Sequence, residues 1–308
     1  MAAMHPALLL NTEVAAALQA GRAVVALEST LIAHGMPWPA NVETARRLEA
    51  EVRAHGAAAA TIAVLGGKLC VGLSGAQLDD LARRGPAIAK ASRRDLPWLI
   101  AQGQDGATTV AATMIIAAMA GIRLFATGGI GGVHRGAAQS FDISADLQEL
   151  ARTDVAVVCA GAKAILDLPR TLELLETLGV LVLGFRTSEL PSFYSVDSGL
   201  LLGHRVDDVG ELAAIVGAHL AAPLGGGGIL VCNPIPLEAA LPRAEIEPVI
   251  GAALEEARRQ GVTGKALTPF LLARLAVLTG GRSVAANRAL ALHNARVGGQ
   301  LAVALRHA

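Results

Sequence analysis

The sequence has few aromatic side chains and no excess of charge of either sign. Among its 308 residues there are two Trp, one Tyr and five Phe, so it offers no row of rings on which successive nucleotide bases could stack. Lys and Arg together number 26, as do Asp and Glu, so the chain has no overall field that attracts a polyanion or a membrane surface. We therefore expect no nucleic-acid partner and no membrane partner.

Cysteine is also scarce, and its spacing excludes a disulfide framework. Cys70, Cys159 and Cys232 lie far apart in apolar stretches, without a CxxC pair, as is typical of buried thiols in a reducing compartment. The first ten residues lack the basic segment of a secretory signal. The longest uncharged apolar stretch, Ala107–Ile122, is short for a membrane span. These features predict a cytoplasmic location.

Apolar residues, in contrast, make up 53% of the chain and charged residues only 17%, which is enough for a substantial core. Short β-branched runs alternate with longer segments of helical periodicity, a pattern typical of layered α/β folds. The predicted strands are Ala23–Leu27, Thr61–Leu65, Ala87–Ala91, Ile122–Ala126, Val155–Ala160, Val180–Phe185 and Gly228–Cys232. The predicted helices are Glu43–His55, Ala76–Arg83, Thr108–Ala120, Ala145–Arg152, Thr171–Leu178, Glu211–Leu220, Ile246–Gln260, Pro269–Thr279 and Val284–Arg306.

One antiparallel excursion is expected within this pattern. The runs Thr61–Leu65 and Leu69–Leu73 flank Gly66-Gly67, and paired glycines accept the positive φ angles of a tight hairpin turn. The glycine-rich stretch Leu224–Gly228 leads directly into a predicted strand, so we do not interpret it as a linker. The sequence therefore predicts a single α/β catalytic domain over residues 1–308, with a mostly parallel central sheet flanked by helices.

Glu28 directly follows a predicted strand, where open α/β sheets usually bind their ligands. A carboxyl group partly buried at such a position has a raised pKa and can act as a general acid, although a capping role would use the same residue. Downstream, His34–Pro39 contains Gly and two Pro and is predicted to be a loop over the site.

Lys90 lies near the end of another predicted strand and is followed by Ser92, Arg93 and Arg94. Three cations and a hydroxyl group within five residues could clamp a phosphomonoester. Lys90 is expected to point inward, where an ammonium group is costly unless it meets an anion. A solvated surface position is an equal alternative for Arg94.

A glycine-rich loop follows a third strand. Residues 128–132 contain four glycines, preceded by Thr127 and followed by His134. Such a loop lets backbone amides approach an anion closely, but its spacing matches neither the dinucleotide fingerprint nor a Walker loop. His134 is as compatible with a structural role as with contact to a ligand.

Asp142 and Asp146 lie four residues apart at a predicted helix start. This spacing would place both carboxylates on one side of the first turn. Capping alone could explain Asp142. The alternative is that one carboxylate serves a divalent cation and the other the substrate. Because no His or Cys cluster accompanies them, any metal should be hard, Mg²⁺ or Mn²⁺.

Lys163 lies in the apolar run Val157–Leu166, and the nearest charged residues are Asp154 and Asp167. Such a setting is expected to lower the pKa of a lysine and leave an amine that can form a Schiff base with a sugar carbon. A structural lysine would instead extend its amine outward to solvent. We favour the nucleophile.

Polar residues near the carboxyl end of the chain are less informative. Asn233, Asn287, His293 and Asn294 suit capping or packing equally well, and Asn287 is the one to test first.

Taken together, these motifs resemble the pseudouridine-5'-phosphate glycosidase family, over about Val25 to Arg296. The motifs that carry the resemblance are Ala26–Thr30 with Ala33–Pro37, Lys90–Asp95, Gly106–Thr113, the glycine loop Ala126–Gly136, Phe141–Leu147 and Cys159–Pro169. The resemblance implies an enzyme with an α/β fold, a homotrimeric assembly and a divalent metal such as Mn²⁺. The implied reaction is the reversible cleavage of pseudouridine 5'-phosphate to uracil and ribose 5-phosphate, with a metabolic link to a pseudouridine kinase.

The resemblance also implies roles for individual residues. Lys163 would be the nucleophile, Glu28 the proton donor and Asp142 the metal ligand. The implied substrate contacts are Lys90, Val110, Ser144, Ala145 and Asp146, with Thr127, His134 and Asn287 completing the site.

The implied lysine chemistry suits the implied bond. A base joined to ribose through carbon leaves poorly by the oxocarbenium route of ordinary glycosidases, and a covalent lysine adduct divides the difficult step. Two alternatives use the same residues: a Schiff-base lyase acting on another phosphosugar, and a phosphosugar-binding protein without turnover.

Overall fold

Strands at the centre of the molecule form one continuous sheet. The computed structural model describes residues 5–221 and 226–307, and in that part of the chain the main strand order is β1-β4-β3-β2-β7-β8-β11-β9-β10, with β6 pairing with both β3 and β5. The strands are β1 (Leu8–Leu10), β2 (Val24–Leu27), β3 (Ala58–Leu65), β4 (Lys68–Val71), β5 (Ala89–Ala91), β6 (Gly106–Thr108), β7 (Leu124–Ala126), β8 (Ala156–Cys159), β9 (Leu181–Phe185), β10 (Arg205–Val206) and β11 (Ile229–Cys232).

Most strand pairs are parallel, as predicted from the sequence. The central strands β2, β7, β8, β11 and β9 all run in the same direction, so their carboxyl ends meet at one edge. The predicted hairpin is confirmed as the antiparallel pair β3 and β4, in which Leu65 faces Lys68 across the turn. A second antiparallel pair, β3 with β6, was not predicted.

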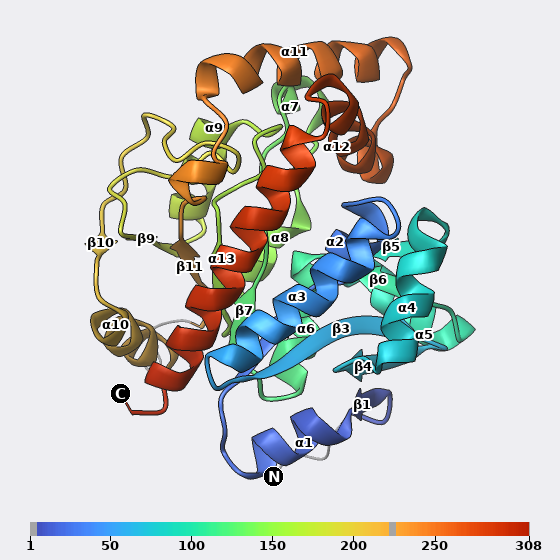
Figure 1. Ribbon diagram of the computed structural model, residues 1–308, viewed down its shortest axis with the longest axis vertical. Coiled ribbons are helices and arrows are strands. Elements are labelled where there is room, and N and C mark those ends of the chain that lie inside the picture. Colours follow the sequence, from blue (N-terminus) through green and yellow to red (C-terminus); the bar gives the residue numbers. More distant parts are fainter. Residues whose placement is uncertain (1–4, 222–225, 308) are drawn as a thin grey trace.

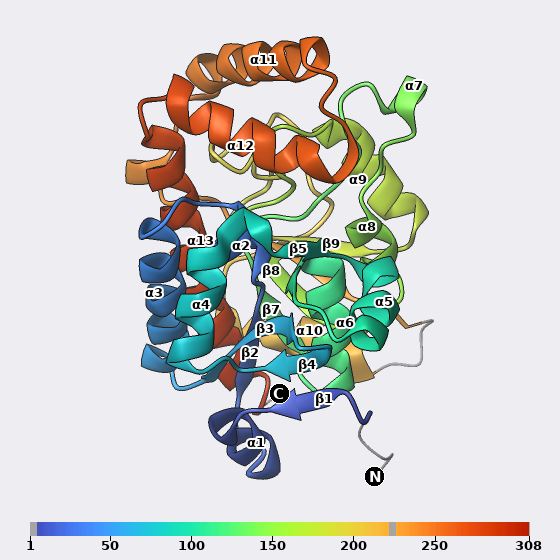
Figure 2. The same ribbon diagram turned by 90° about the vertical axis from the view of Figure 1, so that its right-hand side faces the viewer.

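Helices cover both faces of the sheet and its carboxyl edge. Figure 2 shows α3 and α13 on one side of the strands and α5 and α6 on the other, with α11 and α12 lying beyond the carboxyl ends. The helices are α1 (Thr12–Gln19), α2 (Thr30–His34), α3 (Ala40–Ala54), α4 (Gly75–Arg84), α5 (Leu96–Gln102), α6 (Val110–Met119), α7 (Ala137–Ser140), α8 (Ala145–Leu150), α9 (Leu168–Thr177), α10 (Val209–Ala221), α11 (Arg243–Arg259), α12 (Leu267–Leu278) and α13 (Arg282–Ala304). Short 3₁₀ turns are η1 (Gly85–Ala87), η2 (Arg93–Asp95), η3 (Leu237–Ala239) and η4 (Gly264–Ala266). None of the described helices is long and apolar enough to cross a membrane.

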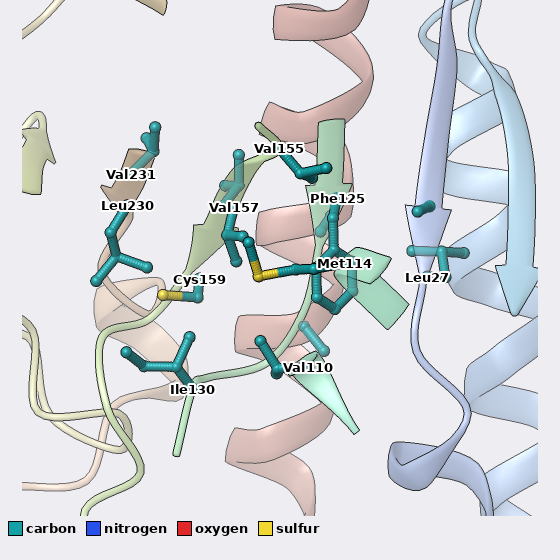
Figure 3. Packing of buried hydrophobic residues seen from close by; sticks show 14 of the residues in the cluster. Leu27, Val110, Met114, Phe125, Ile130, Val155, Val157, Cys159, Leu230 and Val231 are labelled. Carbon is teal, nitrogen blue, oxygen red and sulfur yellow. The ribbon is translucent and has the colours of Figure 1, made fainter. Parts of the chain in front are cut away.

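The core lies between the sheet and the helices on its faces. Strands β2, β7, β8 and β11 are buried along their whole length, because a parallel sheet covered on both faces has no polar side. Figure 3 shows Met114, Phe125, Val157 and Leu230 turned into this interior. One cluster of buried apolar side chains extends from Ala7 to Ala302, so the site at the carboxyl edge rests on a rigid base.

Every predicted strand and helix has a counterpart in the structure, with shifted ends. The elements missed from the sequence are β1, β6, β10, α1, α2, α5 and α7. The predicted helix from Thr108 begins instead at Val110, because Thr109 is its N-cap and Thr108 completes β6. The predicted strand from Ala87 begins at Ala89, after the turn η1. Leu224 and Gly225 of the glycine-rich stretch lie outside the described residues.

Candidate active site

A cavity of about 420 Å³ lies at the carboxyl edge of the sheet. Its walls come from the segments that follow β2, β5, β7 and β8, from the start of α6, and from η4 and α12. The sequence-predicted residues that line it are Glu28, Lys90, Val110, His134, Asp142, Ser144, Ala145, Asp146, Lys163 and Asn287. Thr127 is the one predicted residue that does not line it, and it contacts Glu28 instead.

Glu28 is held by two hydroxyl groups. It follows β2 immediately and is 8% exposed. Its carboxylate accepts hydrogen bonds from Thr30 Oγ1, at the start of α2, and from Thr127 Oγ1, after β7. These contacts fix its orientation toward the cavity, as a proton donor or acceptor at this position requires.

The amine of Lys163 points into the cavity rather than out to solvent. Lys163 lies four residues beyond the end of β8. Its Nζ donates a hydrogen bond to the carbonyl oxygen of Gly129 at 2.6 Å, and its backbone N–H donates to Ile130 O at 3.1 Å. Both flanking residues, Ala162 and Ala164, are buried. The amine can therefore reach a ligand bound in the cavity.

Lys90 faces the same cavity from β5. Burial, together with the charge of Lys163, lowers the pKa of its amine, although Asp146 and Glu28 act in the opposite direction. Lys90 is thus a cation in partly desolvated surroundings, a state that an anionic ligand would stabilise.

The predicted phosphate clamp is only partly available. Arg93 lines the cavity, but its guanidinium donates to both carboxylate oxygens of Glu149, at 2.6 and 2.8 Å. Because Glu149 is 1% exposed, it needs that counter-charge. Ser92 and the exposed Arg94 also line the cavity, so Lys90 and Arg94 are the cations of this segment not bound to Glu149.

The glycine loop binds a carboxylate of the protein itself, the side chain of Asp146. The backbone N–H of Gly131 donates to one carboxylate oxygen of Asp146 at 2.8 Å, and that of Ala111 donates to the other at 2.9 Å. A Cβ atom on Gly131 would come 2.7 Å from the first of these oxygens, so only glycine permits this approach. Asp146 is 5% exposed and is fixed between the loop and the start of α6.

The two aspartates do not share a helix turn, and that prediction was wrong. Helix α8 begins at Ala145 with Ser144 as its N-cap, so Asp142 precedes the helix. The chain is extended there because the carbonyl of Asp142 accepts a hydrogen bond from His134 N at 3.0 Å. Both carboxylates still line the cavity. Among the described residues, no group of three or more His, Cys, Asp or Glu side chains is arranged to hold a metal ion.

Unpaired polar atoms gather at this cavity. In residues 5–221 and 226–307, the buried side-chain nitrogen and oxygen atoms without a partner are His34 Nε2, His134 Nδ1 and Asn287 Oδ1, and all three residues line the cavity. Burial lowers the pKa of both histidines. Because buried polar atoms are nearly always satisfied in folded proteins, these three atoms are placed to hydrogen-bond with water or with a polar ligand in the cavity.

The lining residues that were not predicted from the sequence include Lys265 and Phe193. Lys265, in η4, lines the cavity and pairs with Asp95 at 2.7 Å, yet it lies in a polar turn with no motif around it. Phe193 has a left-handed φ of 66° and packs so closely on Gly129 that a Cβ there would lie 2.6 Å from its ring. Neither contact has a signal in the local sequence.

Comparisons with known proteins show which family the chain resembles. The family described as "Indigoidine synthase A like protein" matches residues 13–304. A protein of Caldanaerobacter subterraneus named pseudouridine-5'-phosphate glycosidase is 58% identical over 96% of this chain and 96% of its own length. A protein of Solibacter usitatus with the same name is 56% identical over 98% of this chain and its full length.

Solved structures share the fold over nearly the whole chain. The prealnumycin C-glycosynthase AlnA, solved in complex with ribulose 5-phosphate, superimposes with a TM-score of 0.90 at 41% identity, covering 98% of both chains. An indigoidine synthase A-like protein of Thermotoga maritima superimposes with a TM-score of 0.88 at 35% identity, again covering 98% of both chains. From the extent of these matches, the chain belongs to the indigoidine synthase A-like family.

Proposed function

We propose that this protein is a pseudouridine-5'-phosphate glycosidase, which reversibly cleaves the C–C glycosidic bond of pseudouridine 5'-phosphate to give uracil and ribose 5-phosphate. The observation that carries the proposal is the convergence of the Lys163 amine, the Glu28 carboxyl group and the Lys90 cation on one cavity. Relatives with this name are 54 to 58% identical over almost the whole chain. A related C-glycosynthase bound to a pentulose phosphate supports a phosphosugar substrate.

The proposed route is covalent and uses Lys163 as the nucleophile. The bond between the sugar C1 and the ring oxygen breaks, and the oxygen takes a proton from Glu28. The neutral Lys163 amine bonds to C1 and gives a proton back to Glu28. The C1–C5 bond to uracil then breaks as the nitrogen lone pair forms the imine, the electron pair of the broken bond goes to the uracil ring, and C5 takes the proton from Glu28. Water hydrolyses the remaining ribose imine, which releases ribose 5-phosphate and frees the amine.

Other residues of the cavity would bind the sugar and its phosphate. Lys90 is suited to the phosphate because an ammonium group there gains from meeting a dianion. Asp146, with both oxygens anchored on backbone amides, is suited to accept hydrogen bonds from sugar hydroxyl groups. His134, Asn287, Ser144, Ala145 and Val110 complete the substrate surface.

We also propose a divalent metal, Mn²⁺ in particular, held through Asp142. One carboxylate ligand from Asp142, which lines the cavity, with water and substrate oxygens as further ligands, suits a hard cation of this kind. The unpaired Nδ1 of His134, whose backbone is bonded to Asp142, fits such surroundings. When bound, the metal would supply positive charge beside the sugar oxygens.

Four broader expectations remain part of the proposal. A single catalytic domain is supported by the continuous core, and a cytoplasmic location by three free, buried cysteines. A homotrimer and a kinase that supplies the phosphorylated nucleoside follow from the family resemblance. The exposed side chains of Phe141 and Ile143 offer a surface that another subunit could cover.

Uracil release is the deciding measurement. The purified protein with Mn²⁺ should convert pseudouridine 5'-phosphate to equal amounts of uracil and ribose 5-phosphate, and should form the nucleotide from these products in reverse. Pseudouridine without phosphate is the matched control substrate. Consumption of other phosphosugars without any uracil chemistry would instead favour a Schiff-base lyase, and binding without turnover would favour a sensor.

A further inference from the structure

A buried asparagine in the middle of α13 donates hydrogen bonds to the glycine loop of the site. Asn294 has no exposed surface and lies inside a 23-residue helix, where asparagine is unfavourable and an unpaired amide is costly. Its Nδ2 donates to the carbonyl oxygens of Thr127 at 2.8 Å and Gly128 at 3.3 Å. The amide thus binds two successive peptide groups just beyond β7.

A second asparagine, Asn233, binds the oxygen atom of the Asn294 side-chain amide. Nδ2 of Asn233, the residue after β11, donates to Asn294 Oδ1 at 2.9 Å. The backbone N–H of Asn233 donates to Cys159 O, at the end of β8, at 2.8 Å. Asn233 is 2% exposed. Because both ends of the Asn294 amide are engaged, rotation would break contacts on each side, and α13 is tied to the ends of β7, β8 and β11.

The peptide groups bound by Asn294 lie between the two reacting side chains. Thr127 donates through its hydroxyl group to Glu28. Gly129, two residues along, accepts the hydrogen bond of the Lys163 amine at 2.6 Å. The loop backbone between them is therefore shared by the proton donor and the nucleophile, and a shift of this backbone would move both.

Packing alone does not require an amide side chain at position 294. The other buried residues around it on α13 are Leu290, Ala291, Ala295 and Val297, which fit the sheet through apolar contact. An apolar side chain in place of Asn294 would satisfy that packing, but the Thr127 carbonyl would lose its donor. The Gly128 carbonyl would keep only the bond from the backbone N–H of Ala160.

We propose that Asn294 is a positioning residue for the reaction, acting through the Thr127–Gly129 backbone on the orientation of Glu28 and Lys163. Asn233 fixes the orientation of the Asn294 amide and acts one step further away. This inference rests on the proposed function, because the proton transfer by Glu28 and the nucleophilic role of Lys163 are both taken from that proposal. Misplacement of reacting groups by fractions of an ångström is enough to lower a rate.

The test compares Asn294→Ala and Asn294→Asp with the unmodified enzyme. The aspartate keeps the shape and the acceptor but loses the donor. We expect kcat for uracil release to fall on the order of 10- to 100-fold, with KM changed by less than about threefold, because no substrate contact is removed. The rate at which borohydride traps ribose 5-phosphate on Lys163 should fall in parallel. The matched control is Ser283→Ala, which removes a buried hydrogen bond with Thr279 at the amino-terminal end of α13.

The control separates positioning from stability. Ser283→Ala should lower the melting temperature and leave kcat within about twofold of the unmodified value. A folded Asn294→Ala enzyme with unchanged kcat and trapping rate overturns the inference, as does an equal kcat loss in the control. If the Asn294 variants do not fold, Asn233→Ala decides: a three- to tenfold loss of kcat supports the inference, and an unchanged kcat rejects it. An unmodified protein that neither traps the sugar nor releases uracil rejects the proposed function itself, and this inference with it.

Discussion

The amine of Lys163 carries the covalent step of the proposed mechanism. Lys163→Ala should reduce uracil release by at least about 10⁴-fold, since a covalent route is lost, while the far-ultraviolet circular dichroism stays unchanged. Borohydride with ribose 5-phosphate should label Lys163 in the unmodified protein, as located by mass spectrometry of peptides. Lys68→Ala, at an exposed lysine that begins β4, is the control. A label on Lys90 instead would show that Lys90, and not Lys163, is the nucleophile.

His34 makes the stability of the fold depend on pH. Its pKa is lowered, first by burial and then by the charge of Lys90. Below the unfolded value of about 6.5, the unfolded chain therefore binds more protons than the folded one, so the free energy of unfolding falls as the pH decreases. Above about 6.5 the two states bind protons equally and this contribution is constant. Urea unfolding from pH 8 to 5 should show the decline.

In the variant His34→Asn, the free energy of unfolding should fall less steeply as the pH decreases, so part of the slope of stability against pH should be lost. His134 and His293 have pKa values lowered by burial in the same way, so the slope should not vanish. His5, a largely exposed histidine near the amino end, is the control position, and His5→Asn should leave the slope unchanged. An identical slope in His34→Asn and the unmodified protein would contradict the prediction.

Asp142 should control metal binding. Excess chelator is expected to remove most activity, and Mn²⁺ should restore it. In Asp142→Asn, Mn²⁺ bound after gel filtration, measured by atomic absorption, should fall by at least about tenfold because the variant loses a charged oxygen ligand. Asp79→Asn, which alters a surface carboxylate paired with Arg46, should bind the metal normally. Full activity in excess chelator would show that the reaction needs no metal.

At the scale of elements, the helices beyond the carboxyl edge contribute a cation that no strand supplies. Lys265, in η4, reaches across to Asp95 in η2 at 2.7 Å and to the carbonyl oxygen of Lys90 at 3.3 Å. A dianion bound beside Lys90 would compete with Asp95 for this amine. Lys265 therefore gives the segment between α11 and α12 a direct contact with the Lys90 side of the cavity.

Lys265→Met should raise KM for pseudouridine 5'-phosphate roughly three- to tenfold with kcat little changed. The size of this expected rise in KM follows from the energy of a charge-assisted hydrogen bond, about 1.5 kcal/mol. That energy is reduced here because the Lys265 side chain is 44% exposed. Asp95→Asn, which weakens the competing pair, should leave KM unchanged or lower it. Steady-state kinetics with the two variants check this, and equal KM values for Lys265→Met and the unmodified enzyme would exclude Lys265 from phosphate binding.

Local patterns in the sequence located the elements that are regular and the residues that follow them. Glu28 and Lys163 were found because each follows an apolar run that forms a buried strand, and buried parallel strands are the clearest signal in such a sequence. Helix α5 was missed because seven residues with Pro97 at the start give little periodicity. Strand β6 was missed because Ala107 opens an apolar run that continues directly into α6.

Contacts between distant segments were beyond local patterns. The sequence placed Arg93 in a phosphate clamp, but its guanidinium binds Glu149, 56 residues away. It placed Asp142 and Asp146 on one helix face, whereas the backbone bond between His134 and Asp142 keeps Asp142 outside the helix. The role of Asn294 depends on the fold bringing α13 against the loop after β7, which no spacing in the chain could reveal.

At the scale of the whole molecule, the parallel sheet explains why distant segments share one site. The ends of β2, β7 and β8 meet at one edge, so Glu28, the glycine loop and Lys163 come together although more than a hundred residues separate the first from the last. Helices α11 and α12 then cover that edge from beyond the sheet (Figure 1). The two outermost strands of the order, β1 on one side of the sheet and β10 on the other, contribute no residue to the cavity.

The segment around α7 is the surface from which we expect association of copies. Phe141 is 83% exposed and has a left-handed φ of 52°, and Ile143, two residues on, is 43% exposed. Burying one such phenyl ring stabilises an interface by about 1.5–3 kcal/mol, and in a symmetric assembly each copy contributes the same contact. Light scattering should give three times the chain mass of 31.4 kDa, and Phe141→Ser should shift the mass toward one chain.

Trp98→Ser is the control for that shift, because Trp98 in α5 is also exposed, at 63%, but lies in a different segment. It should leave the mass unchanged. A single-chain mass for the unmodified protein would contradict the trimer, whereas a trimer that survives Phe141→Ser would place the interface elsewhere. Because Asp142 and His134 adjoin this segment and line the cavity, loss of the trimer in Phe141→Ser should also lower kcat, which links assembly to the ordering of the site.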